Sequence, residues 1–241
     1  MRLGLLWAAA LALAAGGCGV RIGPGGTAEK PGAMIRESKT VERGKAEMVN
    51  VELIIGAGEL KVQGGARGLM EGEFNYNIAA WEPEIRYEDA DFRGRLTVKQ
   101  GEGTAALGKS VNEWNVRLTD EVPVELNVHC GAGDSQLDLR GMNLRGVNVK
   151  MGAGRVELDL RSEHQRDFEV NVEGGVGQAT IRVPKGVAVE AEARGGLGQI
   201  NVHGLKKADG GLWVSDEGER GKPGIRLKVK GGIGEINIHA E

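Results

Sequence analysis

One short motif constrains the fold of this chain more than any other feature. Between residues 56 and 234, six Gly-x-Gly motifs each lie between two runs in which apolar and polar residues alternate. Alternation with a period of two predicts a β-strand with one buried face. Glycine supplies the positive φ or the crowded backbone that a sharp bend between strands requires. We therefore predict structural bends at Gly56, Gly58, Gly131, Gly133, Gly152, Gly154, Gly175, Gly177, Gly196, Gly198, Gly232 and Gly234.

The spacing of the motifs indicates a stack of similar units. From the second motif to the fifth, the first glycines are 21, 23 and 21 residues apart. The last interval, 36 residues, fits one repeat plus an insertion, which we place within 205–222. When the repeats are aligned on the first glycine, the third and fifth residues before it and the sixth after it are always apolar. This pattern predicts an all-β fold, a short β-solenoid of stacked strand repeats.

Two departures from the repeat carry their own expectations. In the last three repeats an additional Gly precedes the motif, as in Gly174–Gly177, and we expect the missing side chain to let neighbouring repeats or an end face approach closely. Residues 66–118 do not follow the aligned repeat, and they contain two Trp and both Tyr of the chain. We predict that this segment is an N-terminal β-meander cap, because the end of a solenoid otherwise exposes apolar surface and unpaired strand edges.

The N-terminus has the pattern of an export signal. Arg2 precedes an apolar run of thirteen residues, Leu3–Ala15, which is too short to span a bilayer as a helix. The run ends in Ala15-Gly16-Gly17-Cys18, which resembles a bacterial lipobox, although Ala15 stands where Leu is usual. We predict lipidation of Cys18, which anchors the protein to a membrane. An ordinary secretory cleavage site is the alternative.

These features give a predicted organisation and location. The domains are a signal peptide (1–17), the lipidated Cys and a flexible tether (18–46), an N-terminal β module (47–118) and the Gly-x-Gly stack (119–241). With Cys18 lipidated, Cys130 has no partner for an intramolecular disulfide. We expect the bacterial cell envelope: the periplasmic face of the outer membrane in a diderm, or the outer face of the cell membrane in a monoderm.

The order of these segments resembles the toast-rack family. The resemblance rests on NVELIIGAGELKVQGGA, on Trp-Glu-Pro-Glu-Ile at 81–85, on EWNVRLTDEVPVELNVHCGAGDSQLDL and on the repeats that follow, and it covers roughly 45–241. It implies a domain of unknown function that relatives place on membrane proteins, including LiaF-like regulators of envelope-stress signalling. The family offers no catalytic residues to transfer. The chain differs from those regulators in carrying a lipobox instead of transmembrane helices.

Several residues qualify as chemical candidates. His203 and His239 share an aligned outward column with Asp138, Asp159 and Arg182, although the insertion leaves the register of the two His uncertain. Zinc needs three or four converging ligands, and a solvated polar face is the favoured interpretation. The other candidates are Cys130 as a nucleophile, Asp138, Asp159 and Glu157 as glycosidase carboxylates, and Trp213 as a sugar platform. We favour structural roles for them: a buried thiol, solvated acids, and a Trp that seals the core.

We therefore predict a non-enzymatic protein without catalytic residues, metal or cofactor. Gly-x-Gly followed by a strand is not a dinucleotide-binding loop, which opens a helix. The formal net charge of −3, or −4 once Arg2 is removed with residues 1–17, offers no basic surface for nucleic acid. The expected partners are the membrane, through Cys18, and an envelope protein or polymer, with envelope-stress sensing as one context. A polysaccharide-binding or polysaccharide-active β-helix protein and an adhesin-like surface repeat are the alternatives.

Overall fold

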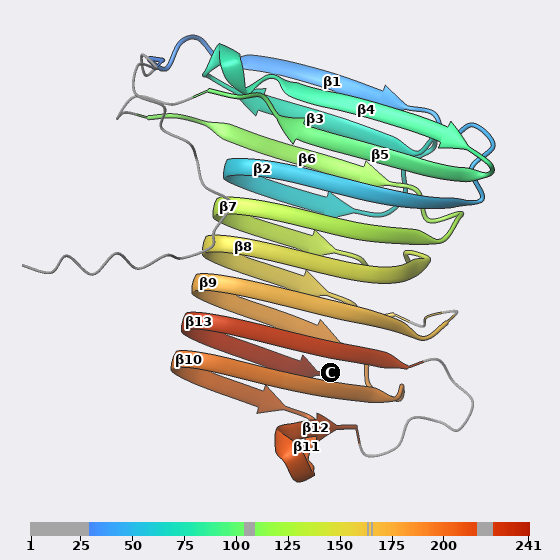
Figure 1. Ribbon diagram of the computed structural model, residues 1–241, viewed down its shortest axis with the longest axis vertical. Helices are drawn as coiled ribbons and strands as arrows, with labels where there is room; N and C mark the ends of the chain where they lie inside the picture. Colours follow the sequence, from blue (N-terminus) through green and yellow to red (C-terminus); the bar gives the residue numbers. More distant parts are fainter. Residues whose placement is uncertain (1–28, 104–108, 163, 165, 216–223) are drawn as a thin grey trace, which may run out of the picture.

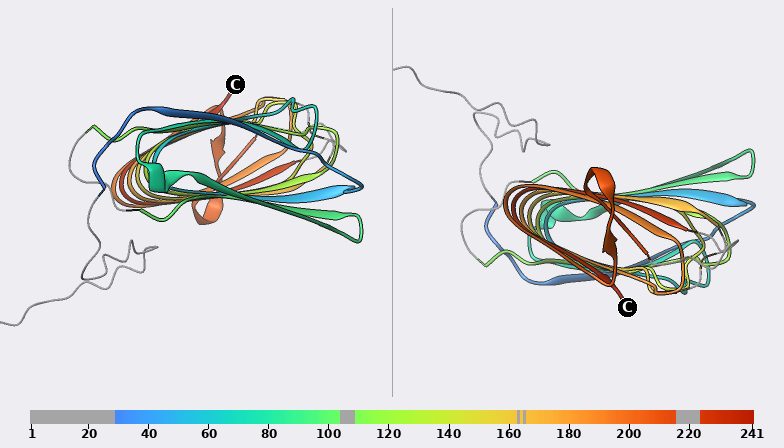
Figure 2. Two further views of the ribbon diagram at one scale, coloured as in Figure 1. Left: turned by 90° about the horizontal axis from the view of Figure 1, so that it is seen from above. Right: turned by 90° about the horizontal axis from the view of Figure 1, so that it is seen from below.

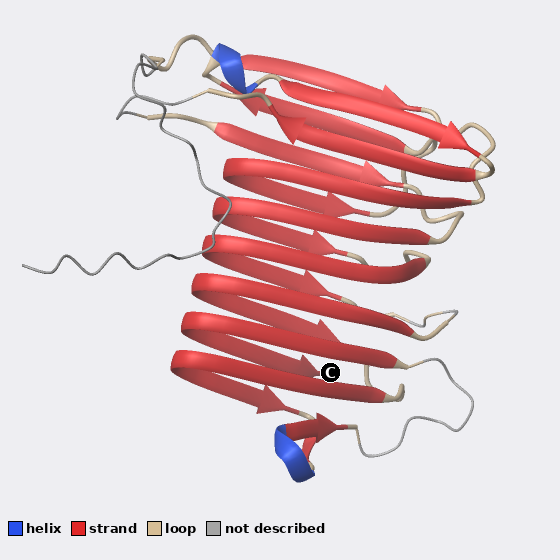
Figure 3. Cartoon of the chain, in the orientation of Figure 1, coloured by secondary structure: helices blue, strands red, loops and turns tan. Residues whose placement is uncertain are grey.

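A computed structural model describes residues 29–103, 109–162, 164, 166–215 and 224–241. The predicted signal peptide and Cys18 lie outside these residues. Strands form most of the described chain (Figure 3). In chain order the elements are β1 (Ile35–Val41), β2 (Met48–Gln63), β3 (Met70–Tyr76), the 3-10 helix η1 (Ala79–Trp81), β4 (Pro83–Ala90), β5 (Arg93–Gln100), β6 (Asn112–Leu118), β7 (Val124–Asp138), β8 (Leu144–Asp159), β9 (Phe168–Val183), β10 (Val189–His203), β11 (Lys206–Lys207), the 3-10 helix η2 (Asp209–Gly211), β12 (Leu212–Val214) and β13 (Ile225–Ala240).

Six long strands, which we call rungs, form the body of the molecule. Each rung folds over at its Gly-x-Gly, so that its two halves lie in two facing layers (Figures 1 and 2). Neighbouring rungs are parallel and in register, and their order in space is β2-β7-β8-β9-β13-β10. The last rung of the chain, β13, thus lies between β9 and β10. The predicted all-β stack is confirmed, with this exchange of order at its lower end.

The core lies between the two layers and is aliphatic. The aligned apolar columns of the sequence point into it, and their members are buried, for example Leu53, Val128 and Ile238. The intervening residues face outward. In the first layer, which the N-terminal halves of the rungs form, four outward asparagines are linked by hydrogen bonds: Asn127 donates to Asn50 (3.3 Å), Asn148 to Asn127 (3.0 Å) and Asn171 to Asn148 (3.0 Å). The amides tie four rungs together on the solvent side.

The bend glycines are required by close approach between rungs. At Gly154 φ is 131°, in the region that favours glycine. A Cβ added to Gly154 would lie 1.9 Å from the carbonyl oxygen of Gly133 in the next rung. At Gly152 the corresponding distance, to the oxygen of Gly131, is 2.4 Å. The same contacts recur down the stack, so both glycines of the motif are needed for the rungs to seat on one another.

The additional glycines of the lower rungs act differently from our expectation. Nothing lies within 4 Å of a Cβ added to Gly174, and at Gly195 the nearest atom, 3.6 Å away, belongs to Ile200 of the same rung. The prediction of close approach between repeats is therefore wrong at these positions. In the upper rungs an apolar side chain such as Met151 occupies this column. Its absence below leaves an apolar hollow of about 70 Å³ behind the bend.

The upper end of the stack carries a cap in two parts. Hairpin β4–β5 extends the first layer, since β5 pairs with Met48–Ile54 of β2. Strands β6, β3 and β1 extend the second layer, since β6 pairs with Glu59–Gln63. β2 is therefore the first rung, although it falls within the predicted module 47–118, and the cap strands β3–β6 come between it and β7 in the chain.

Two further findings concern predicted segments. β1 belongs to this cap, so the prediction of a flexible tether over 18–46 is wrong at Ile35–Val41. The alternation of apolar and polar residues does not identify this strand, because its interior residues, Arg36–Thr40, are all polar or charged. The described part of the insertion, 205–215, contains β11, η2 and β12 and covers part of the lower end. Trp213 packs there against the core, with Lys207 Nζ 5.8 Å from the centre of its ring.

Candidate functional site

The outward column that the alignment identified is continuous in space. The pairing of the rungs places Asp138, Asp159, Arg182, His239 and His203 next to one another in this order. The order of the two His is the reverse of their order in the chain, because β13 precedes β10 in the stack. These residues lie where the second layer ends and each rung turns into its connecting loop.

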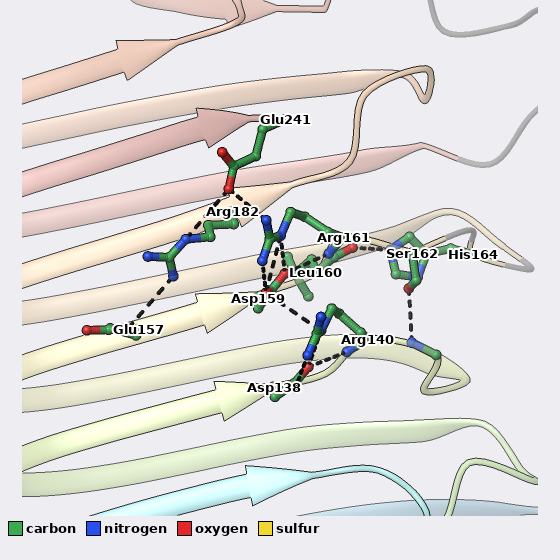
Figure 4. Close-up of polar contacts among 11 residues, drawn as sticks. Asp138, Arg140, Glu157, Asp159, Leu160, Arg161, Ser162, His164, Arg182 and Glu241 are labelled. Atoms are coloured by element: carbon green, nitrogen blue, oxygen red, sulfur yellow. Dashed lines mark hydrogen bonds and ion pairs between the residues drawn. The ribbon is translucent and has the colours of Figure 1, made fainter.

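The two aspartates of this column form ion pairs with arginines (Figure 4). Arg140 binds the carboxylate of Asp138 with both Nε (2.8 Å) and Nη2 (2.6 Å). Arg161 binds Asp159 in the same way, with Nε 3.0 Å from Oδ1 and Nη2 2.7 Å from Oδ2. Such two-point contacts fix the guanidinium and carboxylate planes relative to each other.

Further contacts join these pairs into one network across the rungs. Arg140 Nε lies 3.7 Å from Asp159 Oδ2, and Arg161 Nη1 lies 2.8 Å from Glu241 Oε1. Arg182 reaches both Glu241 (3.7 Å) and Glu157 (3.8 Å). Four carboxylates thus meet three guanidinium groups, and every charge in the network faces one of opposite sign. We call these seven residues the Asp-Arg network.

The network keeps its aspartates ionised. Hydrogen bonds from Arg140 lower the pKa of the Asp138 carboxyl, despite some burial. Partial burial raises the pKa of Asp159, but hydrogen bonds from Arg161 and its charge outweigh that effect, so the pKa is lowered. A glycosidase acid needs the opposite shift, a pKa raised towards neutrality. Neither aspartate is therefore suited to donate a proton to a glycosidic oxygen.

We expect Asp159→Asn to lower the free energy of unfolding by about 1–2 kcal/mol at pH 7. A carboxyl whose pKa is lower in the folded chain stabilises the fold above its unfolded pKa of about 3.9, and this contribution disappears as the pH falls through the folded pKa. The gap between variant and wild type should thus close in acid. Urea unfolding at pH 7 and near pH 3 measures it. Asp134→Asn is the control, since the ion-pair partner of Asp134 among the described residues is the distant Arg155, at 3.8 Å. An Asp159→Asn deficit that is equal at both pH values would contradict the role of the ion pairs.

The two His do not form a metal site with their neighbours. The rings of His203 and His239 are stacked, 5.0 Å apart with an interplanar angle of 3°. The next member of the column, Arg182, is a cation. Within the described part of the chain, no group of three or more His, Cys, Asp or Glu side chains is placed to hold a metal ion.

The other candidates have structural surroundings. Cys130 is buried in the core, and burial raises the pKa of its thiol, so the thiolate is disfavoured. The adjacent His129 points to the opposite face, where its Nε2 lies 3.8 Å from Glu52 Oε1. Trp213 contacts the core, in agreement with a sealing role.

Sequence reasoning missed two features. The first is the arginine partners, although Asp-Leu-Arg recurs at Asp138–Arg140 and Asp159–Arg161 with the 21-residue period of the stack. The second is the middle residue of the bend motif. It is Ala in the upper rungs but Val176, Ile233 and Leu197 in the lower ones, with 52%, 54% and 71% of these side chains exposed. These three residues, neighbours in register, form what we call the apolar ridge.

The fold defines a class of protein: a stack of parallel β-rungs folded over glycine bends. This chain belongs to the toast-rack family, since the family model described as the N-terminal domain of toast_rack, DUF2154, matches residues 30–182. No curated protein matches the chain. No helix of the described residues is long and apolar enough to cross a bilayer.

Solved structures provide relatives. The chain is similar to a candidate cell adhesion protein from Clostridium sporogenes ATCC 15579, with 33% identity, a TM-score of 0.80, and coverage of 87% of this chain and 100% of that one. A candidate adhesin from Bacteroides fragilis NCTC 9343 matches with 12% identity, a TM-score of 0.32, and coverage of 87% and 99%. The second likeness is too weak to carry an argument.

Proposed function

We propose that this protein is a lipid-anchored binding module of the bacterial cell envelope, which holds another envelope protein on its lower rungs and performs no catalysis. The family and the Clostridium relative support a protein of the cell surface or envelope. That relative is described as a candidate cell adhesion protein, a role that depends on binding.

The observation that carries the proposal is the apolar ridge. Exposed apolar side chains that cluster on the surface of a protein mark contact sites for other molecules. The ridge lies directly over the hollow left by Gly174, Gly231 and Gly195, whose lining includes Val172 and Ile236. A ridge beside a hollow can interlock with an apolar side chain of a partner, which is how the energetically dominant contacts of protein interfaces are built.

Photo-crosslinking in the native envelope tests this surface. A photoreactive residue at Ile233 should capture a discrete protein, whereas the same residue at Ala132, at the bend of an upper rung, should not. Ile233→Asp should abolish capture from a probe at Leu197, because a carboxylate cannot be desolvated in an apolar contact. Equal capture from Ile233 and Ala132 would contradict a specific role of the ridge.

The membrane anchor can be tested by replacing one cysteine at a time. Cys18→Ala should abolish incorporation of a labelled fatty acid and release the protein from the membrane fraction, because acyl chains on this residue supply the attachment. Cys130→Ala is the matched control, since Cys130 is buried, and it should keep both label and attachment. Continued labelling of the Cys18→Ala protein would rule out the lipobox assignment.

A further inference from the structure

The stack ends on β10, whose outer edge is paired over only part of its length. β12 pairs with Glu190–Glu192, but no strand of the described chain pairs with that edge from Ala193 to His203. An edge strand presents a row of unpaired N–H and C=O groups. The missing neighbour also leaves side chains uncovered: Ile200 is 37% exposed, whereas Ile236, its counterpart in β13, is 4% exposed.

The opposite end of the stack closes the same part of the rung. At the bend of β2, the Gln100 Oε1 accepts a hydrogen bond from the Gly56 N–H (2.8 Å), and the Asn112 Nδ2 donates to the Ala57 carbonyl (2.8 Å). Side chains thus replace the missing neighbour of the first bend. At the bend of β10, none of the described residues supplies such a contact. Backbone groups at the bend of β2 therefore have hydrogen-bond partners from the cap, whereas those at the outer edge of the β10 bend have none among the described residues.

Charge also distinguishes the two ends. The edge strand β1 carries Arg36, Glu37 and Lys39, and charged side chains are a common protection of strand edges against pairing. The segment from Gly195 to Val202 carries no charged residue. It adds Leu197 and Ile200 to the exposed surface. The lower edge therefore has the composition of a surface that accepts another strand.

We infer that the outer edge of β10 from Ala193 to His203 is the acceptor for an extended strand of a partner protein, which adds in parallel and in register with this part of the rung. This inference rests on the proposed function, in that the stack binds a protein. The new contact continues the interface that joins each rung to the next. Main-chain hydrogen bonds provide affinity in this mode of recognition, and side-chain positions provide specificity.

The bend fixes the sequence that the partner must carry. A Cβ added to Gly198 would lie 1.7 Å from the carbonyl oxygen of Gly234, and one added to Gly196 would lie 2.4 Å from that of Gly232. A rung seated on β10 in the same way meets the oxygens of Gly198 and Gly196. The partner strand therefore carries its own Gly-x-Gly, with apolar residues in the columns that face the core.

A second copy of the whole stack does not fit this edge. β12 and β11 continue beyond β10 (Figure 1). They would hold the end rungs of two copies at least roughly 10 Å apart, whereas a hydrogen-bonded ladder needs about 4.8 Å. The two exposed apolar side chains are also few for a stable dimer, which buries about 800 Å² on each partner. A single strand can pair with the edge beside the insertion.

A synthetic peptide with the sequence of residues 193–203 is the appropriate probe, since β12 already occupies the edge at Glu190–Glu192. β10 itself seats on β13, whose residues match it column by column from Gly195/Gly231 to His203/His239, so its sequence suits the equivalent edge of β10. We expect the fluorescently labelled peptide to bind the purified full chain in an anisotropy titration. The same peptide with Gly198→Val should bind at least about tenfold more weakly. Absence of binding, or equal binding by the two peptides, would overturn the inference.

Variants of the protein locate the binding. Ile200→Lys should weaken peptide binding at least about tenfold, because it places a charge on the edge. Phe92→Lys, at another exposed apolar residue, should leave it unchanged. Stronger binding by Ile200→Lys would show that the peptide replaces the protein's own β10, and a concentration-dependent dimer that Ile200→Lys dissociates would assign the edge to a second copy. Either result overturns the inference. If the peptide binds as expected but crosslinking from the ridge captures no protein, the proposed function fails and the strand acceptor stands.

Discussion

Replacing Gly154 with Val should lower the melting temperature by roughly 10 °C or more, or prevent folding altogether. Two effects combine at this residue. Its φ of 131° is strained for any residue with a Cβ, and that Cβ would lie 1.9 Å from the carbonyl oxygen of Gly133. The obstacle is backbone in a neighbouring rung, so no side-chain rotation relieves it. The rungs on either side have to separate.

Arg155→Val is the matched control for this variant. Arg155 is the next residue, faces outward, and makes only weak contacts with Gln178 (3.4 Å) and Asp134 (3.8 Å). Its replacement should change the free energy of unfolding by no more than about 1 kcal/mol. Circular dichroism melting of the two variants makes the comparison. Equal melting temperatures would mean that the bend glycines are not what fixes the spacing of the rungs.

Ending the chain after residue 224 should detach the lower end of the stack. This truncation removes β13, the rung that lies between β9 and β10. β10 pairs with the body of the stack only through β13 among the described strands, so residues 189–215 lose their attachment together. The stack above, from β1 to β9, keeps its own pairing. Hydrogen exchange should show amides of 189–203 that open with almost no free-energy cost, while those of β7 and β8 stay protected.

A chain that ends after Ala240 is the control for the truncation. It keeps the whole of β13 and loses only Glu241, which makes half-exposed ion pairs with Arg161 and Arg182 and backbone hydrogen bonds at the end of the rung. The expected loss of stability is about 1 kcal/mol or less. Protection of β10 in the chain that ends after residue 224 would show that β10 can seat on β9 directly, and the position of β13 would then be dispensable.

The sequence predicts those parts of the fold that repeat. Each apolar column, such as the one that contains Leu53 and Val128, records the same environment six times, so the pattern stands out from a single chain. The bend glycines can be recognised in the sequence for the same reason, because their motif recurs in every rung. A single strand without such repetition, like Ile35–Val41, has no comparable signal, and its polar interior made it resemble a linker.

The order of the rungs could not be predicted from these columns. β9, β10 and β13 have the same pattern, so each fits equally well beside either of the others, and the insertion at 205–222 allows the chain to return to either edge.

The Asp-Arg network could be predicted from the sequence only in part. Its acids lie in an aligned column, but Arg140 and Arg161 lie in loops just after the rungs, outside the alternation. The contact of Arg161 with Glu241 joins residues 80 positions apart and depends on the exchanged order of the rungs.

The strict register of the rungs has a consequence for how this protein can change over evolutionary time. A duplication of 21 residues, from one bend to the next, adds one complete rung, and a deletion of the same length removes one; either change leaves every column intact. Each such event alters the height of the stack by about 4.8 Å and leaves both end surfaces in place. The number of rungs thus sets the distance between the two ends of the stack, in discrete steps. If the protein is anchored as we propose, this number sets how far its lower end can stand from the membrane.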